Sequence, residues 1–217
     1  MLSAHLRVFY LHGFASSSTS RKAQFFRRQL ANLGIELGIP DLSEDNFQAL
    51  TISGQLKVIE RETAQAAARG ERVVLIGSSL GGYLAALHAA CHPAVDRLIL
   101  LAPAFGFYQL WTTELGTERL ALWKENGSIP IFHYGEGREL PLGFQLMEDA
   151  ERYEPFPVFP QPALLFHGTR DPLVPVSYSA NYAKAHENVH LCELDSGHEL
   201  TDVLEEIWLQ TKPFLAL

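Results

Sequence analysis

Cysteine is scarce in this sequence. The 217 residues include two cysteines, Cys91 and Cys192, and neither belongs to a C-x-x-C pair. Two isolated thiols exclude a disulfide framework and a zinc site built on paired thiolates. We therefore expect both cysteines to be small buried hydrophobic residues, in a protein that works in the reducing cytoplasm.

Positive charge and long apolar runs are also in short supply. Lysine and arginine number 17 against 25 aspartates and glutamates, which gives a formal net charge of −8. This surplus of negative charge argues against nucleic acids and anionic membranes as partners. The longest apolar run, residues 98–108, is interrupted by Pro103. It is too short for a membrane-spanning helix, which needs roughly 18 apolar residues.

Cofactor and metal motifs are missing as well. The sequence contains neither G-x-G-x-x-G nor G-x-x-x-x-G-K-[ST], so nothing indicates a nucleotide cofactor. His88 and His92 have the spacing of a metal-binding pair, but they lie in an alanine-rich stretch. The histidines that lack any H-E-x-x-H context are His133, His167, His186 and His190. We expect no cofactor, no metal and a small-molecule substrate as the partner. The sequence leaves the oligomeric state open.

The sequence does contain a regular alternation of apolar strands and amphipathic helices. Such alternation is typical of a parallel sheet covered by helices on both faces. We expect one domain, residues 1–217, with six strands in the order 2-1-3-4-5-6. The expected strands are residues 6–11, 35–42, 72–77, 97–102, 163–167 and 189–194, and the expected helices are residues 21–33, 51–69, 80–91, 177–187 and 199–210.

One long stretch, residues 104–161, interrupts this rhythm and shows no obvious strand. It holds 11 of the 23 aromatic residues and nine acidic against four basic side chains. It is too long for an ordinary connection, so we interpret it as a cap inserted over the carboxyl end of the sheet. Phe14 together with Phe105, Phe107 and Trp111 would form an apolar substrate-binding wall. The alternative is that the aromatic residues form the cap's own core.

The most informative motif is Gly77-Ser78-Ser79-Leu80-Gly81, a G-x-S-x-G placed directly between a buried strand and a helix. In that context the motif predicts a sharp turn that exposes the central serine at the top of the sheet. Ser79 is therefore the candidate nucleophile. The alternative is a glycine-rich turn with no catalytic role.

A serine nucleophile needs a base, and the base needs an acid to orient it. His198 follows the last expected strand and is the candidate base. Asp171 follows the fifth strand and is the candidate acid, because the order Ser, Asp, His matches that of α/β-hydrolases. Asp195, three residues before His198, is the rival acid. Both Asp171-Pro and the His198 loop also have plain structural readings as a turn and a helix start.

Two backbone N–H groups should bind the oxyanion that forms during acyl transfer. Leu80, directly after Ser79, should supply one of them. Phe14 should supply the other, from the loop that follows the first strand. Strands one and three are neighbours in the expected order, so their carboxyl-end loops should meet. His12 in the same loop would orient it.

These residues together resemble the α/β-hydrolase superfamily over almost the whole chain. Tyr10-Leu11-His12-Gly13-Phe14 with the serine-rich loop after it is similar to the small YqiA-like esterases. Residues 167–175 and the cap also resemble the mammalian α/β-hydrolase acyl-protein thioesterases. The resemblance implies hydrolysis of acyl esters or thioesters.

The sequence thus predicts an α/β-hydrolase fold and a serine hydrolase that cleaves carboxylic esters of short to medium acyl chains through an acyl-enzyme. A thioesterase with the same triad is one alternative. A non-catalytic binding protein of the same fold is the other.

Overall fold

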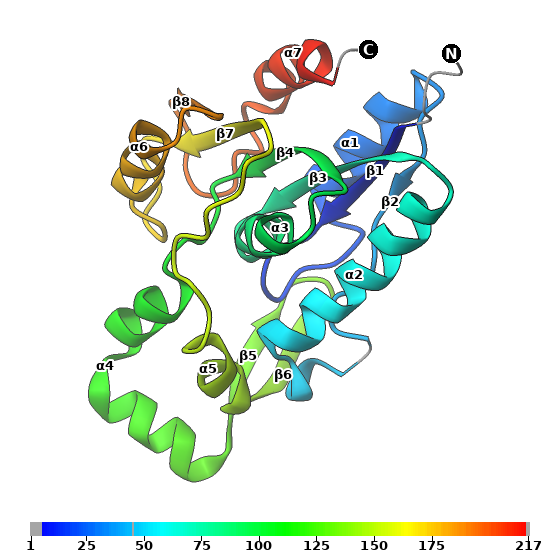
Figure 1. Ribbon diagram of the computed structural model, residues 1–217. Coiled ribbons are helices and arrows are strands. Elements are labelled where there is room, and N and C mark those ends of the chain that lie inside the picture. Colours follow the sequence, from blue (N-terminus) through cyan, green and yellow to red (C-terminus); the bar gives the residue numbers. More distant parts are fainter. Residues whose placement is uncertain (1–5, 45, 216–217) are drawn as a thin grey trace.

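The computed structural model describes residues 6–44 and 46–215, and its main feature is a six-stranded parallel sheet (Figure 1). The strands lie in the order β2-β1-β3-β4-β7-β8, and every neighbouring pair is parallel. This confirms the expected order. The bounds are β1 (Leu6–Leu11), β2 (Leu37–Gly38), β3 (Arg72–Ser78), β4 (Val95–Leu101), β7 (Ala163–Gly168) and β8 (Val189–Leu194).

Helices cover both faces of this sheet, as Figure 1 shows. Alternate residues of each strand enter different cores: Leu75 packs with α2 and α3, whereas Val74 and Ile76 pack with α1 and α7. Because both faces are buried, the strands need apolar residues at nearly every position. The helices are α1 (Arg21–Ala31), α2 (Ile52–Ala68), α3 (Leu80–Cys91), α6 (Val176–Ala185) and α7 (Leu204–Phe214).

Two elements begin or end elsewhere than the sequence suggests. The expected strand 35–42 is reduced to the two residues of β2. The last helix begins at Leu204 and not at residue 199. Leu200 adopts a left-handed conformation with φ 53°, which a helix cannot include.

The inserted stretch contains a β-hairpin, so the expectation that residues 104–161 lack a strand is wrong. After the long helix α4 (Phe107–Asn126), strands β5 (Ser128–His133) and β6 (Arg138–Gly143) pair antiparallel, followed by α5 (Gln145–Ala150). Pro130 and Pro141 lie opposite each other in this pair. Proline is rare inside larger sheets and hides the strand signal, but a two-stranded ribbon tolerates it.

The hairpin folds back over the loops that follow β1 and β2. Tyr134 N–H donates to the Ala15 carbonyl oxygen (2.8 Å), and β6 lies against the short helix η1 (Phe47–Ala49). Asp149 of α5 accepts hydrogen bonds from the backbone and hydroxyl of Ser53 on α2. The hairpin and α5 are therefore fixed on the β1–β2 side of the molecule, whereas Phe105 and Phe156 of the same insertion pack on α6.

The two cysteines differ in their exposure to solvent. Cys192 is buried, but Cys91 is exposed at the end of α3, which corrects the expectation that both are buried.

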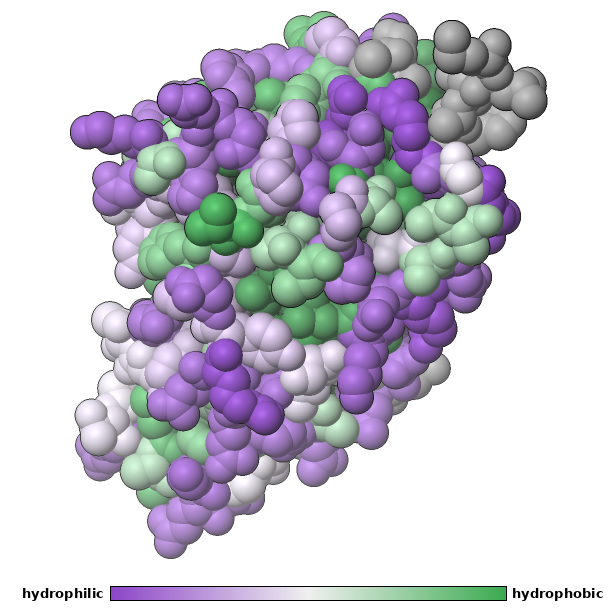
Figure 2. Space-filling model, viewed as in Figure 1, coloured by the Kyte–Doolittle hydropathy of each residue, from purple (hydrophilic) through white to green (hydrophobic). Residues whose placement is uncertain are grey.

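In the view of Figure 2, hydrophilic residues cover most of the rim and smaller apolar patches lie between them. Across residues 6–44 and 46–215, the structure has no helix with the length and hydrophobicity to cross a bilayer.

Candidate active site

The turn between β3 and α3 has the strained geometry of a nucleophile elbow. Ser79 adopts φ 52° and ψ −117°, a left-handed conformation that non-glycine residues rarely take. The neighbouring glycines are required by space. A Cβ atom on Gly77 would overlap the Gly81 carbonyl, and one on Gly81 would overlap the Leu11 carbonyl. The G-x-S-x-G spacing thus gives the turn that lifts the Ser79 hydroxyl out of the sheet.

Three predicted side chains meet in one hydrogen-bonded row above this turn. His198 Nε2 lies 3.0 Å from Ser79 Oγ, and His198 Nδ1 lies 2.7 Å from Asp171 Oδ2. An ionised carboxylate can only accept, so Nδ1–H donates to Asp171. That tautomer leaves Nε2 of the neutral ring free to accept the Ser79 proton.

The rival acid lies elsewhere. The Asp195 side chain is 87% exposed and pairs with Arg170 (2.9 Å). By contrast, the Asp171 side chain is completely buried against His198. Geometry therefore favours Asp171 over Asp195 as the partner of His198.

Asp171 is held by more groups than the sequence indicates. Its Oδ1 accepts the N–H groups of Leu173 (2.8 Å) and Val174 (2.9 Å), and its Oδ2 lies 3.1 Å from Nε2 of the buried His167. His167 Nδ1 lies 2.7 Å from the Ser179 hydroxyl of α6. His167 Nε2 also lies 3.0 Å from the Val174 carbonyl oxygen, so Nε2–H is shared between that oxygen and the Asp171 carboxylate. The Ser179 hydroxyl therefore donates to Nδ1.

These bonds decide the charge of Asp171. Burial acts to raise the pKa of this carboxyl, but the hydrogen bonds from His167, His198 and the Val174 N–H outweigh it and hold the pKa below its usual range. Asp171 is therefore ionised at neutral pH. Sequence reasoning missed His167. Its position at the end of a strand, four residues before the acid, is the signal that could have found it.

A buried lysine holds the histidine loop. Lys22 Nζ donates to the Glu199 carbonyl oxygen (2.7 Å) and to its carboxylate (3.1 Å). Gly168 permits the close approach of this loop, since a Cβ atom there would overlap the carbonyl groups of Ser196 and Gly197. Burial lowers the pKa of Lys22, while the Glu199 carboxylate acts to raise it. Lys22 was also missed, because the contact spans 177 residues of sequence.

The expected oxyanion loop lies against the elbow. A Cβ atom on Gly13 would be 3.4 Å from the Ser79 Cβ atom, an ordinary contact. The backbone N–H groups of Phe14 and Leu80 donate no hydrogen bond to any other backbone group in the described residues. His12 Nδ1 lies 3.0 Å from the Gly13 carbonyl oxygen and donates to it, which agrees with an orienting role. Burial lowers the pKa of His12, so its ring is neutral near pH 7.

The four aromatic residues expected to contact the substrate have different surroundings in the structure. Phe14 lies between Phe47 (ring centroids 5.5 Å apart) and Trp111 (5.1 Å). Phe105 and Phe107 are buried, packed on Tyr182 and on Tyr83 respectively, and Phe107 also contacts Trp111. Contact of these four rings with a substrate stays a prediction, beside the alternative that they form the cap's own core.

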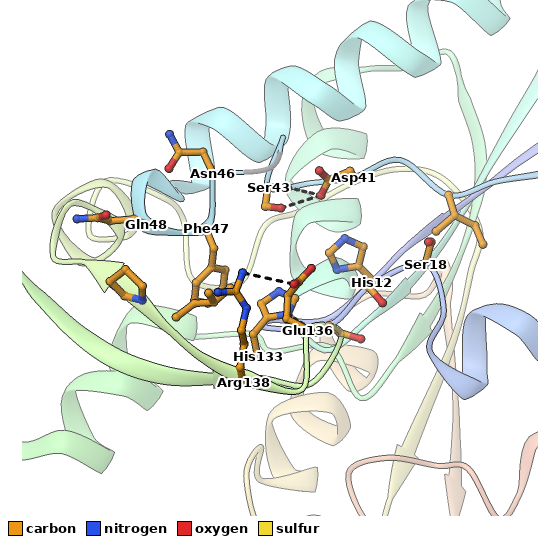
Figure 3. A pocket seen from close by; sticks show the side chains of 15 residues that line it. His12, Ser18, Asp41, Ser43, Asn46, Phe47, Gln48, His133, Glu136 and Arg138 are labelled. Atoms are coloured by element: carbon orange, nitrogen blue, oxygen red, sulfur yellow. Dashed lines mark hydrogen bonds and ion pairs between the residues drawn. The ribbon is translucent and has the colours of Figure 1, made fainter.

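A cavity of about 550 Å³ opens beside the oxyanion loop, on the β1–β2 side (Figure 3). Sequence reasoning did not find it, because its walls come from distant segments that only the hairpin brings together. A much smaller cavity, lined by Gly13 and Phe14 among others, adjoins it. The large cavity is lined by His12, Ser16, Ser17, Ser18, Ile39, Asp41, Ser43, Asn46, Phe47, Gln48, His133, Glu136, Arg138, Leu140 and Pro141. No group of three metal-binding side chains occurs in the part of the chain that the structure describes.

The sequence matches one protein-family model, and the structure is similar to solved structures of other proteins. The model of the uncharacterised protein family UPF0227 matches residues 7–215. No curated protein has a matching sequence.

Among solved structures, Est1E from Butyrivibrio proteoclasticus with ferulic acid bound has a TM-score of 0.76 at 21% identity, over 95% of this chain and 89% of that one. The mouse alpha/beta hydrolase domain-containing protein 10 has a TM-score of 0.79 at 19% identity, over 96% and 89%. A structure of the metagenome-derived lipolytic enzymes LipS and LipT has a TM-score of 0.73 at 20% identity, over 99% and 95%. The chain therefore has the α/β-hydrolase fold.

Proposed function

The chain belongs to the uncharacterised family UPF0227, and we propose that it is a serine hydrolase that cleaves carboxylic esters of short to medium acyl chains. One observation carries this proposal: Ser79, His198 and Asp171 form a continuous hydrogen-bonded row at a strained elbow. A strained, partly buried row of this kind is costly to maintain, and catalysis gives a reason for it.

The proposed reaction follows from the atoms present. Ser79 Oγ attacks the acyl carbon while His198 Nε2 takes its proton, and the Phe14 and Leu80 N–H groups bind the oxyanion. His198 then returns the proton to the departing alkoxide, which leaves an acyl-serine and a free alcohol. Water, deprotonated by His198, then attacks the acyl-serine. His198 returns that proton to Ser79 Oγ as the bond to the acyl carbon breaks, which releases the carboxylic acid and restores the free serine. Asp171 holds the histidine tautomer and stabilises the imidazolium.

Labelling with a fluorophosphonate probe tests the proposal directly, because such probes react with activated serines. We expect the wild-type chain to be labelled at Ser79, as mass spectrometry of the peptide would show. Ser79→Ala should abolish labelling, and the adjacent Ser78→Ala should retain it. Absence of labelling in the folded wild-type chain would support the non-catalytic binding alternative.

The same labelling reaction reports the substrate class. Competition with p-nitrophenyl esters from acetate to hexanoate should show stronger protection for the longer chains, because each buried methylene contributes about 0.8 kcal/mol. A parallel series of thioesters tests the thioesterase alternative, which uses the same residues. Stronger protection by thioesters than by matched esters would favour that alternative.

A further inference from the structure

The cavity beside the oxyanion loop shares walls with the nucleophile's surroundings. His12 lines the large cavity and also donates to the carbonyl oxygen of Gly13, a residue at which an added Cβ atom would lie 3.4 Å from Ser79 Cβ. Phe47, on the opposite wall, contacts the Phe14 ring. Figure 3 shows His12, Asp41 and His133 around the same space, next to Phe47. The large cavity therefore adjoins the loop expected to bind the oxyanion, and a portion of a substrate that reached past this loop from Ser79 would enter it.

The walls of the cavity are polar but carry no dominant charge. Of the 15 lining residues, 11 are polar, and they include both donors and acceptors. Asp41 and Glu136 are acidic and Arg138 is basic, with Glu136 and Arg138 3.6 Å apart. Burial lowers the pKa of His12 and of His133, so both rings are neutral near pH 7. Glu136 and Arg138 offset each other, so the formal charge of the walls is −1, and neither an anionic nor a strongly cationic ligand would meet a cluster of opposite charge.

Neutral hydroxyl groups suit such walls, because each hydroxyl both donates and accepts a hydrogen bond. The ring of Phe47 adds one apolar surface that the C–H face of a short carbon chain can cover. We infer that this cavity binds a neutral polyhydroxylated portion of the substrate, such as a glycerol or sugar moiety. This inference rests on the proposed ester hydrolysis at Ser79 and names the substrate class of that site.

The hydroxyl groups could belong to the alcohol half or to the acyl half of the ester, and three substrates separate these sources. Ethyl butyrate is the reference. Glycerol 1-monobutyrate carries hydroxyls on the alcohol, and ethyl 3,4-dihydroxybutyrate carries them on the acyl chain. We expect one of the two hydroxylated esters to have a kcat/KM about tenfold above the reference, which corresponds to about two added hydrogen bonds.

A double variant, Gln48→Ala with Arg138→Ala, connects the preference to the cavity. Both side chains are exposed on its rim. The variant should lose the roughly tenfold preference, measured as the ratio of kcat/KM for the hydroxylated ester to kcat/KM for ethyl butyrate. Arg27→Ala with Gln65→Ala is a matched control, because both residues are exposed on helices α1 and α2, outside the cavity wall. The control should retain the preference.

The outcomes separate this inference from the proposed function. Failure of fluorophosphonate labelling and of ethyl butyrate hydrolysis would overturn the proposed function. Normal hydrolysis of ethyl butyrate with no gain for either hydroxylated ester would overturn the polyol site alone. A gain that persists in the Gln48→Ala, Arg138→Ala variant would also overturn it, since the preference would then arise elsewhere.

Discussion

The two sides of Ser79 differ in how their polar groups are used. On the β7–β8 side, Asp171 and His167 are fully buried and bind only other groups of the protein. On the β1–β2 side, polar side chains surround an open cavity of about 550 Å³. The first arrangement fixes tautomers and charge, which proton transfer requires. The second leaves donors and acceptors facing outward, which recognition requires. We call the β7–β8 side the closed side and the β1–β2 side the open side. We expect mutations on the closed side to change kcat and mutations on the open side to change substrate preference.

The largest loss of kcat should come from substitution of Ser79, which lies between the two sides. Ser79→Ala should lower kcat on p-nitrophenyl butyrate by about 10⁴–10⁶-fold. The fold should survive, because the hydroxyl makes no capping bond and, within the described residues, its one hydrogen-bond partner is His198. Circular dichroism and thermal unfolding check the fold. A larger loss in Ser78→Ala than in Ser79→Ala would show that the elbow register is wrong.

The next effect tests the closed side at its acid. Asp171→Asn should cost roughly 10⁴-fold in kcat, because an amide at that position favours the wrong tautomer of His198. Asp195→Asn is the control, since its carboxylate is exposed and bound to Arg170. It should leave kcat within about twofold of wild type. Steady-state kinetics of both variants on one ester is the measurement, and the reverse ranking would give the acid role to Asp195.

A smaller loss of kcat is expected from changing His167, which contacts Asp171 and not the reacting groups. His167→Phe keeps a buried ring but removes the Nε2–H that Asp171 accepts. Hydrogen bonds to charged groups contribute roughly 1.5–3 kcal/mol, so kcat should fall by about 10- to 100-fold with little change in KM.

His167→Gln is the matched variant, because its amide can still donate to Asp171, and it should recover part of the loss. The rate of fluorophosphonate labelling should follow kcat in both variants. Equal losses in the Phe and Gln variants, or a change confined to KM, would contradict a role in holding Asp171.

Sequence reasoning succeeded where the signal is local. The apolar strands are recognisable because both faces of the sheet are buried, and the order of β1 and β3 follows from the fold that they imply. Gly77 and Gly81 are required by backbone contacts within the elbow itself, so the motif predicts the turn. His198 and Asp171 lie side by side because each follows a strand at the same edge of the sheet, and their roles as base and acid stay predictions.

The failures share a different cause. The sequence did not predict the β5–β6 hairpin because it contains Pro130 and Pro141, and proline is more typical of loops than of strands. The cavity and Lys22 depend on contacts between segments that lie far apart in the sequence, and no local pattern encodes them. Cys91 was expected in the core, but it is the last residue of α3, where the helix reaches the surface.

Acidification should separate the two sides at different pH values. Burial lowers the pKa of His12 and His133 on the open side, so folding favours their neutral rings. The stability that they contribute is lost as pH falls below the unfolded histidine pKa of about 6.5. The pKa of Asp171 is also lowered, but for an acid the contribution persists above about 3.9 and is lost only below it. Between these limits the open side should weaken while the contribution of Asp171 persists.

The smallest predicted effect is therefore a local loosening between pH 7 and pH 5, measured by amide hydrogen exchange after correction for the intrinsic rate. Residues 12–18 and 133–141, which surround the cavity, should exchange severalfold faster at pH 5, because protonated His12 and His133 favour open conformations. Residues 163–175, which hold His167 and Asp171, should keep their protection. His133→Gln removes one titrating ring and should reduce the pH response of the hairpin. Equal loosening of both segments would show that the two sides of Ser79 respond to pH as one unit, which would contradict the comparison.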